Sequence, residues 1–152
     1  MTETGSQAHL YTIGVFSLVR NAEGHILLVR QAYGEGLWTL PGGRLEAGED
    51  PTAGAVRETW EEARVTTRIS GFLGTYVMPF RGNLVLAFVA EVIEMAHWQP
   101  DGEIADMGWF PPDALPHPMG PFSRIRILDA EAGLTGVLRV HTDNQGTVGR
   151  AI

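Results

Sequence analysis

Three carboxylates gather on one face of a predicted helix. Pro51 and Thr52 are suited to the first turn of that helix, and at about 100° per residue Glu58, Glu61 and Glu62 fall on one side of it. Like charges three and four residues apart repel in an isolated helix by a few tenths of a kcal/mol. A divalent cation such as Mg²⁺, which prefers carboxylate and carbonyl oxygen, would offset that repulsion.

A solvated acidic helix face is the plainer interpretation of these residues. It leaves the neighbours unexplained. Arg57 is adjacent to Glu58 and four residues before Glu61, so its guanidinium could orient a carboxylate. The pair Gly42-Gly43 precedes the helix, where glycine lets backbone carbonyls come close to the same ion. The surroundings therefore favour a site over a solvated face.

The segment from Gly43 to Val65 resembles the Nudix box. That motif is a Gly, five residues, a Glu, seven residues, and then Arg-Glu-apolar-x-Glu-Glu-x-Gly-apolar. The matching residues are Gly43, Glu49, Arg57, Glu58, Glu61, Glu62 and Val65. Two positions of this segment differ from the motif. Thr59 replaces an apolar residue, and its methyl group can still pack. Arg64 replaces a Gly that would favour a left-handed helix end, so the helix should end differently or run on slightly.

The resemblance implies an α+β Nudix fold, an α/β/α sandwich with a mixed central sheet, across roughly residues 9–130. We expect a flexible tail at 1–8 and a single domain at 9–152. The implied activity is a pyrophosphohydrolase that needs Mg²⁺ or Mn²⁺ and cleaves a nucleoside diphosphate linked to a further group X. The resemblance also implies that water attacks phosphorus and that a homodimer can form.

The family's roles carry over residue by residue. Glu58, Glu61 and Glu62 become metal ligands, with the carbonyl of Gly42 beside them, and Arg57 holds Glu58 in position. Glu49 should pair or hydrogen-bond near the glycine loop.

Nudix members differ in their general base, so a glutamate of the box and an acid from a distant loop both remain open. Glu103 is the outside candidate for catalysis and metal binding, because it lies several residues before Trp109 in a family-like segment. An ordinary loop acid is its plainer interpretation, since loops are usually polar. Asp101 and Asp106 are weaker alternatives.

Substrate contacts are predicted from charge and aromatic character. The 11 basic residues are all Arg, so any side-chain cation on a pyrophosphate is an Arg, which can bind in bidentate fashion. Arg30, Arg44 and Arg81 are the candidates. Trp38 could stack on a nucleobase, although a Trp on a short strand is more often part of the core.

Composition restricts the partners and the chemistry. The net charge of −7 over 152 residues disfavours nucleic-acid binding by bulk charge and attraction to an anionic membrane. The absence of Cys excludes thiolate metal sites and a Cys nucleophile. The first residues have no signal-peptide pattern and no apolar run is long enough to span a bilayer, so we expect a cytoplasmic protein.

Periodicity predicts the elements that position these residues. Strands are expected at 10–20, 25–31, 37–40, 66–80, 84–93 and 107–110. The first helix should bury Ala53, Val56, Trp60 and Ala63. A second helix should span 121–132 with an apolar face of Phe122, Ile125, Leu128 and Ala132. Residues 133–152 give no pattern.

Two other functions fit the same residues. A nucleotide sensor on the same scaffold could bind without turnover, although a sensor need not keep the full ligand set that this chain keeps. An α+β interaction module with an acidic helix face would not change its melting temperature with divalent ions, whereas a metal site would.

Overall fold

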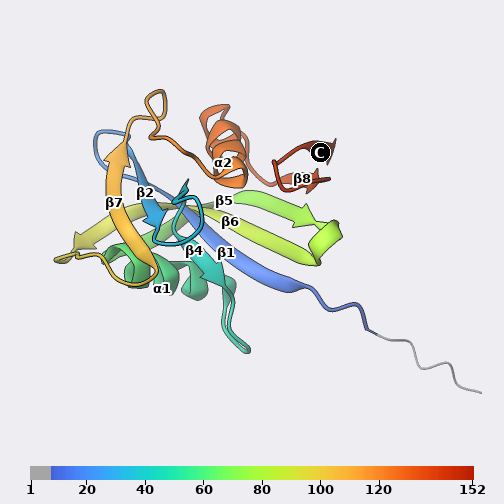
Figure 1. The fold of residues 1–152 in the computed structure, drawn as a ribbon, viewed down its shortest axis with the longest axis horizontal. Coiled ribbons are helices and arrows are strands. Elements are labelled where there is room, and N and C mark those ends of the chain that lie inside the picture. Colours follow the sequence, from blue (N-terminus) through green and yellow to red (C-terminus); the bar gives the residue numbers. More distant parts are fainter. Residues whose placement is uncertain (1–7) are drawn as a thin grey trace, which may run out of the picture.

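The structure is a computed structural model that describes residues 8–152, with two helices set against a mixed sheet (Figure 1). The predicted tail at 1–8 lies, apart from Ala8, outside the described residues. The elements, in chain order, are β1 (Thr12–Arg20), β2 (Ile26–Gln31), β3 (Trp38–Thr39), β4 (Gly42–Arg44), α1 (Pro51–Ala63), β5 (Val65–Met78), the 3₁₀ turn η1 (Pro79–Arg81), β6 (Asn83–Met95), β7 (Ile104–Phe110), α2 (Pro121–Glu131), β8 (Val137–His141) and β9 (Val148–Ala151).

Strand β1 lies in the interior of the sheet, whose order is β3-β2-β1-β6-β5-β8-β9. It runs parallel to β6 along its whole length, from Thr12 opposite Asn83 to Arg20 opposite Glu91. Its pairing with β2 is limited to Arg20 opposite Ile26, after which the two strands diverge. The short strand β4 pairs with the edge of β1 that this divergence leaves, and so brings the Gly42-Gly43 segment into the sheet.

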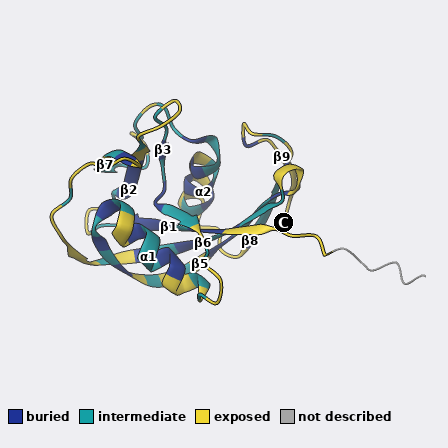
Figure 2. Ribbon diagram, turned by 60° about the horizontal axis from the view of Figure 1, so that its bottom comes forward, coloured by how far each residue is buried: buried dark blue, intermediate teal, exposed yellow. Residues whose placement is uncertain are grey.

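The helices cover opposite faces of the sheet, which confirms the predicted α/β/α sandwich (Figures 1 and 2). Alternate side chains of β1 go to the two sides. Val15 packs in a cluster with Ala55 of α1, whereas Leu18 packs in a cluster with Ile127 of α2. Because residues i and i+2 of a strand share a face, one central strand contributes to both core layers.

Several strand boundaries differ from the predicted ones. The Gly42-Gly43 segment, expected to be a loop, is strand β4. Strand β7 begins at Ile104 instead of 107 because it pairs with β2 as far as Gln31. The unassigned C-terminal region forms β8, which adds to β5 in parallel, and β9. These assignments depend on pairing partners distant in sequence, which local patterns do not report.

Helix α1 begins and ends with specific contacts. The Asp50 carboxylate accepts hydrogen bonds from the backbone N–H groups of Thr52 and Ala53, which caps the first turn. At the other end, Arg64 itself adopts the left-handed conformation, with φ of 56°. The helix therefore ends where the family pattern has Gly and does not run on. The Arg64 guanidinium lies 4.2 Å from the ring centroid of Trp60.

The predicted core face of α1 is wrong apart from Ala63. The side that contacts the sheet carries small residues, namely Gly54, Ala55, Thr59 and Ala63, and Trp60 is 46% exposed. The prediction placed the largest apolar side chains inside, but small residues let the helix approach the sheet closely. Thr59 is fully buried, and its hydroxyl donates to the carbonyl of Ala55.

Helix α2 buries polar side chains that periodicity did not indicate. Ile127 is buried as a core residue, but Leu128 is exposed and Asp129 is buried. The carboxylate of Asp129 accepts from the Tyr76 hydroxyl at 2.9 Å, and Arg139 of β8 donates to both of its oxygens. This contact ties α2 to two strands through one carboxylate.

We predict that Asp129→Ala lowers the free energy of unfolding by about 2–4 kcal/mol, because it leaves the buried Tyr76 hydroxyl and the part-buried Arg139 guanidinium without their acceptor. Urea denaturation measures the loss. Asp113→Ala, at an exposed loop position, should change stability by less than about 0.5 kcal/mol. Equal stability of the two variants would contradict the assigned role of Asp129.

Candidate active site

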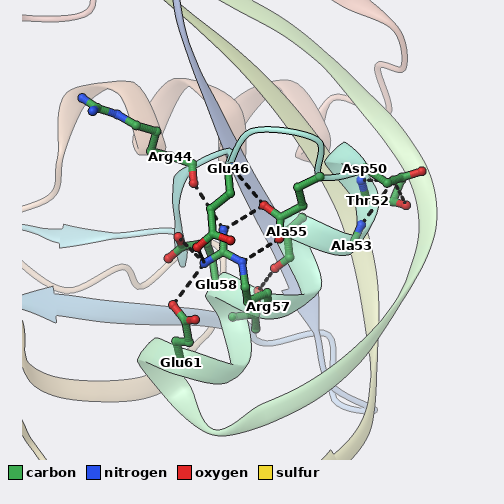
Figure 3. Close-up of polar contacts among 11 residues, drawn as sticks. Arg44, Glu46, Asp50, Thr52, Ala53, Ala55, Arg57, Glu58 and Glu61 are labelled. Carbon is green, nitrogen blue, oxygen red and sulfur yellow. Dashed lines mark hydrogen bonds and ion pairs between the residues drawn. The ribbon is translucent and has the colours of Figure 1, made fainter.

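Arg57 lies at the centre of the acidic helix face (Figure 3). Its Nε and Nη2 donate to the two carboxylate oxygens of Glu49 at 2.7 and 2.9 Å, and its Nη1 donates to Glu58 at 2.9 Å and Glu61 at 3.2 Å. A further N–H reaches the carbonyl of Arg44 at 3.3 Å. One guanidinium thus joins α1 to the loop before it and to β4.

The loop between β4 and α1 is closed by Glu49, as expected for a residue that pairs near the glycines. Its carboxylate also accepts the backbone N–H of Glu46 at 3.1 Å. A Cβ at Gly54 would lie 2.8 Å from a Glu49 oxygen, so only glycine at this point of α1 leaves space for the carboxylate. The hydrogen bond from Arg57 has the largest effect in lowering the pKa of Glu49.

The two glycines of β4 bring the backbone close to the box glutamates. A Cβ at Gly42 would lie 2.4 Å from both the Phe16 ring and the carbonyl of Val15. A Cβ at Gly43 would lie 2.6 Å from the carboxyl carbon of Glu58. The N–H of Gly42 donates to Glu62 at 2.7 Å. Glycine is therefore required here for contact between β4 and the carboxylates of α1.

Burial changes the acidity of two of these carboxyl groups. Burial, followed by the charges of Glu58, Glu103 and Glu61, raises the pKa of Glu62 to about 8, against the lowering effect of the Gly42 N–H. Burial also raises the pKa of Glu58, although Arg57 opposes it. These two groups therefore lie in an environment that disfavours negative charge without an added cation.

Glu103, from the loop before β7, lies within electrostatic reach of the box, since its charge contributes to the raised pKa of both Glu58 and Glu62. Its carbonyl accepts the N–H of Ala32, which fixes the loop to the end of β2. Asp101 has a structural contact instead, because its carboxylate accepts the N–H groups of Glu103 and Ile104.

The carboxylate oxygens of the box glutamates are ligands of the kind that divalent cations prefer. Within residues 8–152 no three acidic or histidine side chains converge to hold an ion in the present arrangement. In that arrangement Arg57 donates to Glu58 and Glu61, and the Gly42 N–H donates to Glu62. Among the described residues, Glu62 nevertheless accepts only that one hydrogen bond, while it is buried near the charges of Glu58, Glu61 and Glu103. Hard oxygen ligands concentrated in this way suit Mg²⁺ or Mn²⁺.

A cavity of about 900 Å³ opens beside this cluster. Glu62, Gly42 and Gly43 form part of its wall, together with two of the predicted substrate contacts, Arg44 and Arg81. The other two lie outside the lining. Arg30 is exposed, with its guanidinium 6.0 Å from the Trp38 ring, and Trp38 itself is 8% exposed and packs edge-on against Phe110. Trp38 is therefore a core residue, as its plainer interpretation held.

Sequence reasoning missed Arg126, which lines the same cavity from α2. It lies in no motif, and its position on the buried face of a helix resembles that of an apolar residue. Only the spacing from Phe122, four residues earlier on a predicted buried stripe, could have marked it.

The chain matches the NUDIX domain model over residues 10–130. It is 32% identical over 132 residues to a MutT-like protein of Streptomyces ambofaciens, covering 87% of this chain and 84% of that one. It is 36% identical over 130 residues to a Bacillus subtilis protein provisionally named 8-oxo-dGTP diphosphatase, covering 84% and 85%.

A NUDIX hydrolase structure from Nitrosomonas europaea superposes with a TM-score of 0.76 at 21% identity, covering 90% of this chain and 82% of that one. The chain belongs to the Nudix hydrolase family, and the predicted fold and enzyme class are confirmed. Within residues 8–152 no helix is long and apolar enough to cross a membrane.

We predict that Arg57→Gln lowers the free energy of unfolding by about 1–3 kcal/mol in metal-free buffer, because Glu49, Glu58 and Glu61 lose the cation that they share. Thermal denaturation in EDTA measures this. Arg68→Gln, which removes an exposed ion pair with Glu91, should cost less than about 1 kcal/mol. Equal losses would show that the Arg57 contacts are ordinary surface pairs.

Proposed function

We propose that the protein is a divalent-metal-dependent pyrophosphohydrolase that cleaves a nucleoside diphosphate linked to a further group X. The observation that carries the proposal is the position of the buried Glu62 carboxylate and the β4 glycines in the wall of the cavity, next to the carboxylates that Arg57 holds. A cavity of about 900 Å³ is in the range of known small-molecule sites.

Glu58, Glu61, Glu62 and the carbonyl of Gly42 would hold Mg²⁺ or Mn²⁺, with Glu103 available from the facing loop. When bound, such a cation neutralises pyrophosphate charge and activates water as a nucleophile. It also lets a polyanion approach a protein of net charge −7.

Arg57 acts as a positioning residue, since its contacts fix the rotamers of Glu58 and Glu49 and leave the cavity wall to other groups. A box glutamate or Glu103 would take the proton from the attacking water. Arg44 and Arg81 would contact the substrate from the cavity wall.

Nucleoside triphosphates, oxidised dNTPs, ADP-ribose and nucleotide sugars all fall in the proposed substrate class. The Bacillus subtilis relative's name makes oxidised dGTP the first compound to test. A nucleotide-type small molecule is thus the proposed partner, while the homodimer and the cytoplasmic location stay predictions.

We predict that Glu58→Gln and Glu62→Gln each lower kcat/KM by at least about 100-fold, or about 3 kcal/mol of transition-state stabilisation. Chromatographic separation of the nucleotide products in Mg²⁺ and in Mn²⁺, across the substrates above, measures it. Gln keeps an oxygen that can accept the Gly42 N–H at position 62 and the Arg57 N–H at position 58, so the fold should persist in both variants.

Glu94→Gln, at an exposed position of β6, should keep wild-type activity. Full metal-dependent activity in both box variants would defeat the proposal. Tight nucleotide binding by the wild-type protein without turnover in either metal would favour the sensor instead.

A separate measurement assigns the general base. If Glu103 takes the proton, Glu103→Gln lowers kcat by about 100-fold and removes the acidic limb of its pH profile. If a box glutamate does so, Glu103→Gln changes kcat by less than about tenfold and keeps that limb. Asp113→Asn, in the exposed loop after β7, is the matched control and should keep both kcat and the profile.

A further inference from the structure

Arg126 of α2 is a buried cation that lines the cavity. Arg126 is only 3% exposed, and it forms part of the cavity wall together with Arg81 and Phe122. The mechanism proposed above uses the acidic part of the cavity and gives Arg126 no role.

No carboxylate in the described residues pairs with Arg126. Its Nε has no hydrogen-bond partner, and no acid lies within ion-pair distance of its guanidinium. The acid three residues along the helix, Asp129, is already bound by Arg139 and by the Tyr76 hydroxyl. Arg126 instead has its guanidinium carbon 4.8 Å from the Phe16 ring centroid and 5.2 Å from that of Tyr76.

Such a group is costly in the ligand-free fold. An unpaired buried charge is strongly disfavoured, and the nearby charge of Arg81 adds repulsion. Burial lowers the pKa of Arg126 to about 10, which still leaves it protonated at neutral pH. The contacts with the Phe16 and Tyr76 rings offset only part of that cost.

The first turn of α2 adds a further positive feature to the same wall. Gly120, Pro121, Phe122 and Ser123 all line the cavity. No side chain caps this helix end, and Gly120 occupies the N-cap position. The helix dipole therefore presents its positive end next to the two guanidinium groups.

We propose that Arg126, Arg81 and the first turn of α2 form an oxyanion subsite, which binds a phosphate or carboxylate of the substrate other than its cleaved diphosphate. The inference rests on the proposed function, and it narrows the substrate class to nucleotides that carry an additional anionic group. Arg has five N–H donors and no acceptor, so its ligand must be an acceptor, and an anion would also neutralise its charge.

Inorganic phosphate in EDTA tests the subsite without metal or turnover. Relative to chloride at equal ionic strength, saturating phosphate should raise the melting temperature of the wild-type protein by about 3 °C or more. Arg126→Met should lose this shift while its own ligand-free melting temperature rises, because a buried charge is replaced by an apolar chain of similar length. A merely structural Arg126 would give the opposite change in ligand-free stability.

Arg124→Gln is the matched control, since Arg124 is an exposed residue of the same helix and lies outside the cavity lining. It should keep the phosphate-dependent shift. The subsite is overturned if wild type shows no shift, or if Arg126→Met keeps it.

Matched substrate pairs identify the source of the anion. ADP-ribose is compared with its phosphorylated form, and a nucleoside diphosphate glucose with the corresponding glucuronate. The anionic member of at least one pair should have the higher kcat/KM, and Arg126→Met should lower that value about 10–100-fold with little effect on the neutral member. Equal losses for both members of each pair would overturn the proposal.

The phosphate measurement separates this inference from the function on which it rests. Glu62→Gln should be inactive and yet keep the phosphate-dependent shift. If no substrate is hydrolysed but the shift persists and depends on Arg126, the anion subsite stands and the hydrolase proposal fails. If hydrolysis depends on Glu62 but phosphate causes no shift in melting temperature, the hydrolase proposal stands and the anion subsite fails.

Discussion

The organisation of this protein depends on keeping several carboxylates close together on one short helix. Repulsion among them is offset in the ligand-free fold by a single guanidinium, that of Arg57, which contacts Glu49, Glu58 and Glu61. The surrounding backbone is adapted to this cluster. Gly43 makes space for Glu58, Gly54 makes space for Glu49, and the N–H of Gly42 contacts Glu62. Strand β4 can supply Gly42 and Gly43 because β2 leaves the edge of β1 free.

The sequence predicted the cluster because the chemistry is local. The box residues occupy 23 consecutive positions, and helical spacing alone places Glu58, Glu61 and Glu62 together. The structure brings Arg57, Glu49 and the glycines to the same place, and their catalytic and metal-binding roles remain proposals. Glu103 could be predicted only by resemblance, since the pairing of β7 with β2 carries its loop toward the box.

Predictions failed where packing depended on distant partners. The buried face of α1 was assigned to Trp60, because large apolar residues usually carry burial, yet Ala55 and Thr59 contact the sheet instead. The polar residues of α2 are buried against strands whose positions periodicity does not report, Arg126 against β1 and β5 and Asp129 against β5 and β8. The end of α1 also differs from the motif, because Arg64 adopts the left-handed conformation that is usual for the Gly at this position.

The end of α1 is held in place by hydrogen bonds to other segments of the chain. The side chain of Trp98 donates to the backbone carbonyl of Glu62 at 2.8 Å, while the N–H of Gly42 holds the Glu62 carboxylate. The N–H of Ala96 contacts the carbonyl of Arg64 next to it. Glu62 is thus anchored through its main chain and its side chain by two different segments. The entropy of ordering this residue is lost when the chain folds, so a ligand that binds beside it meets a scaffold already in place.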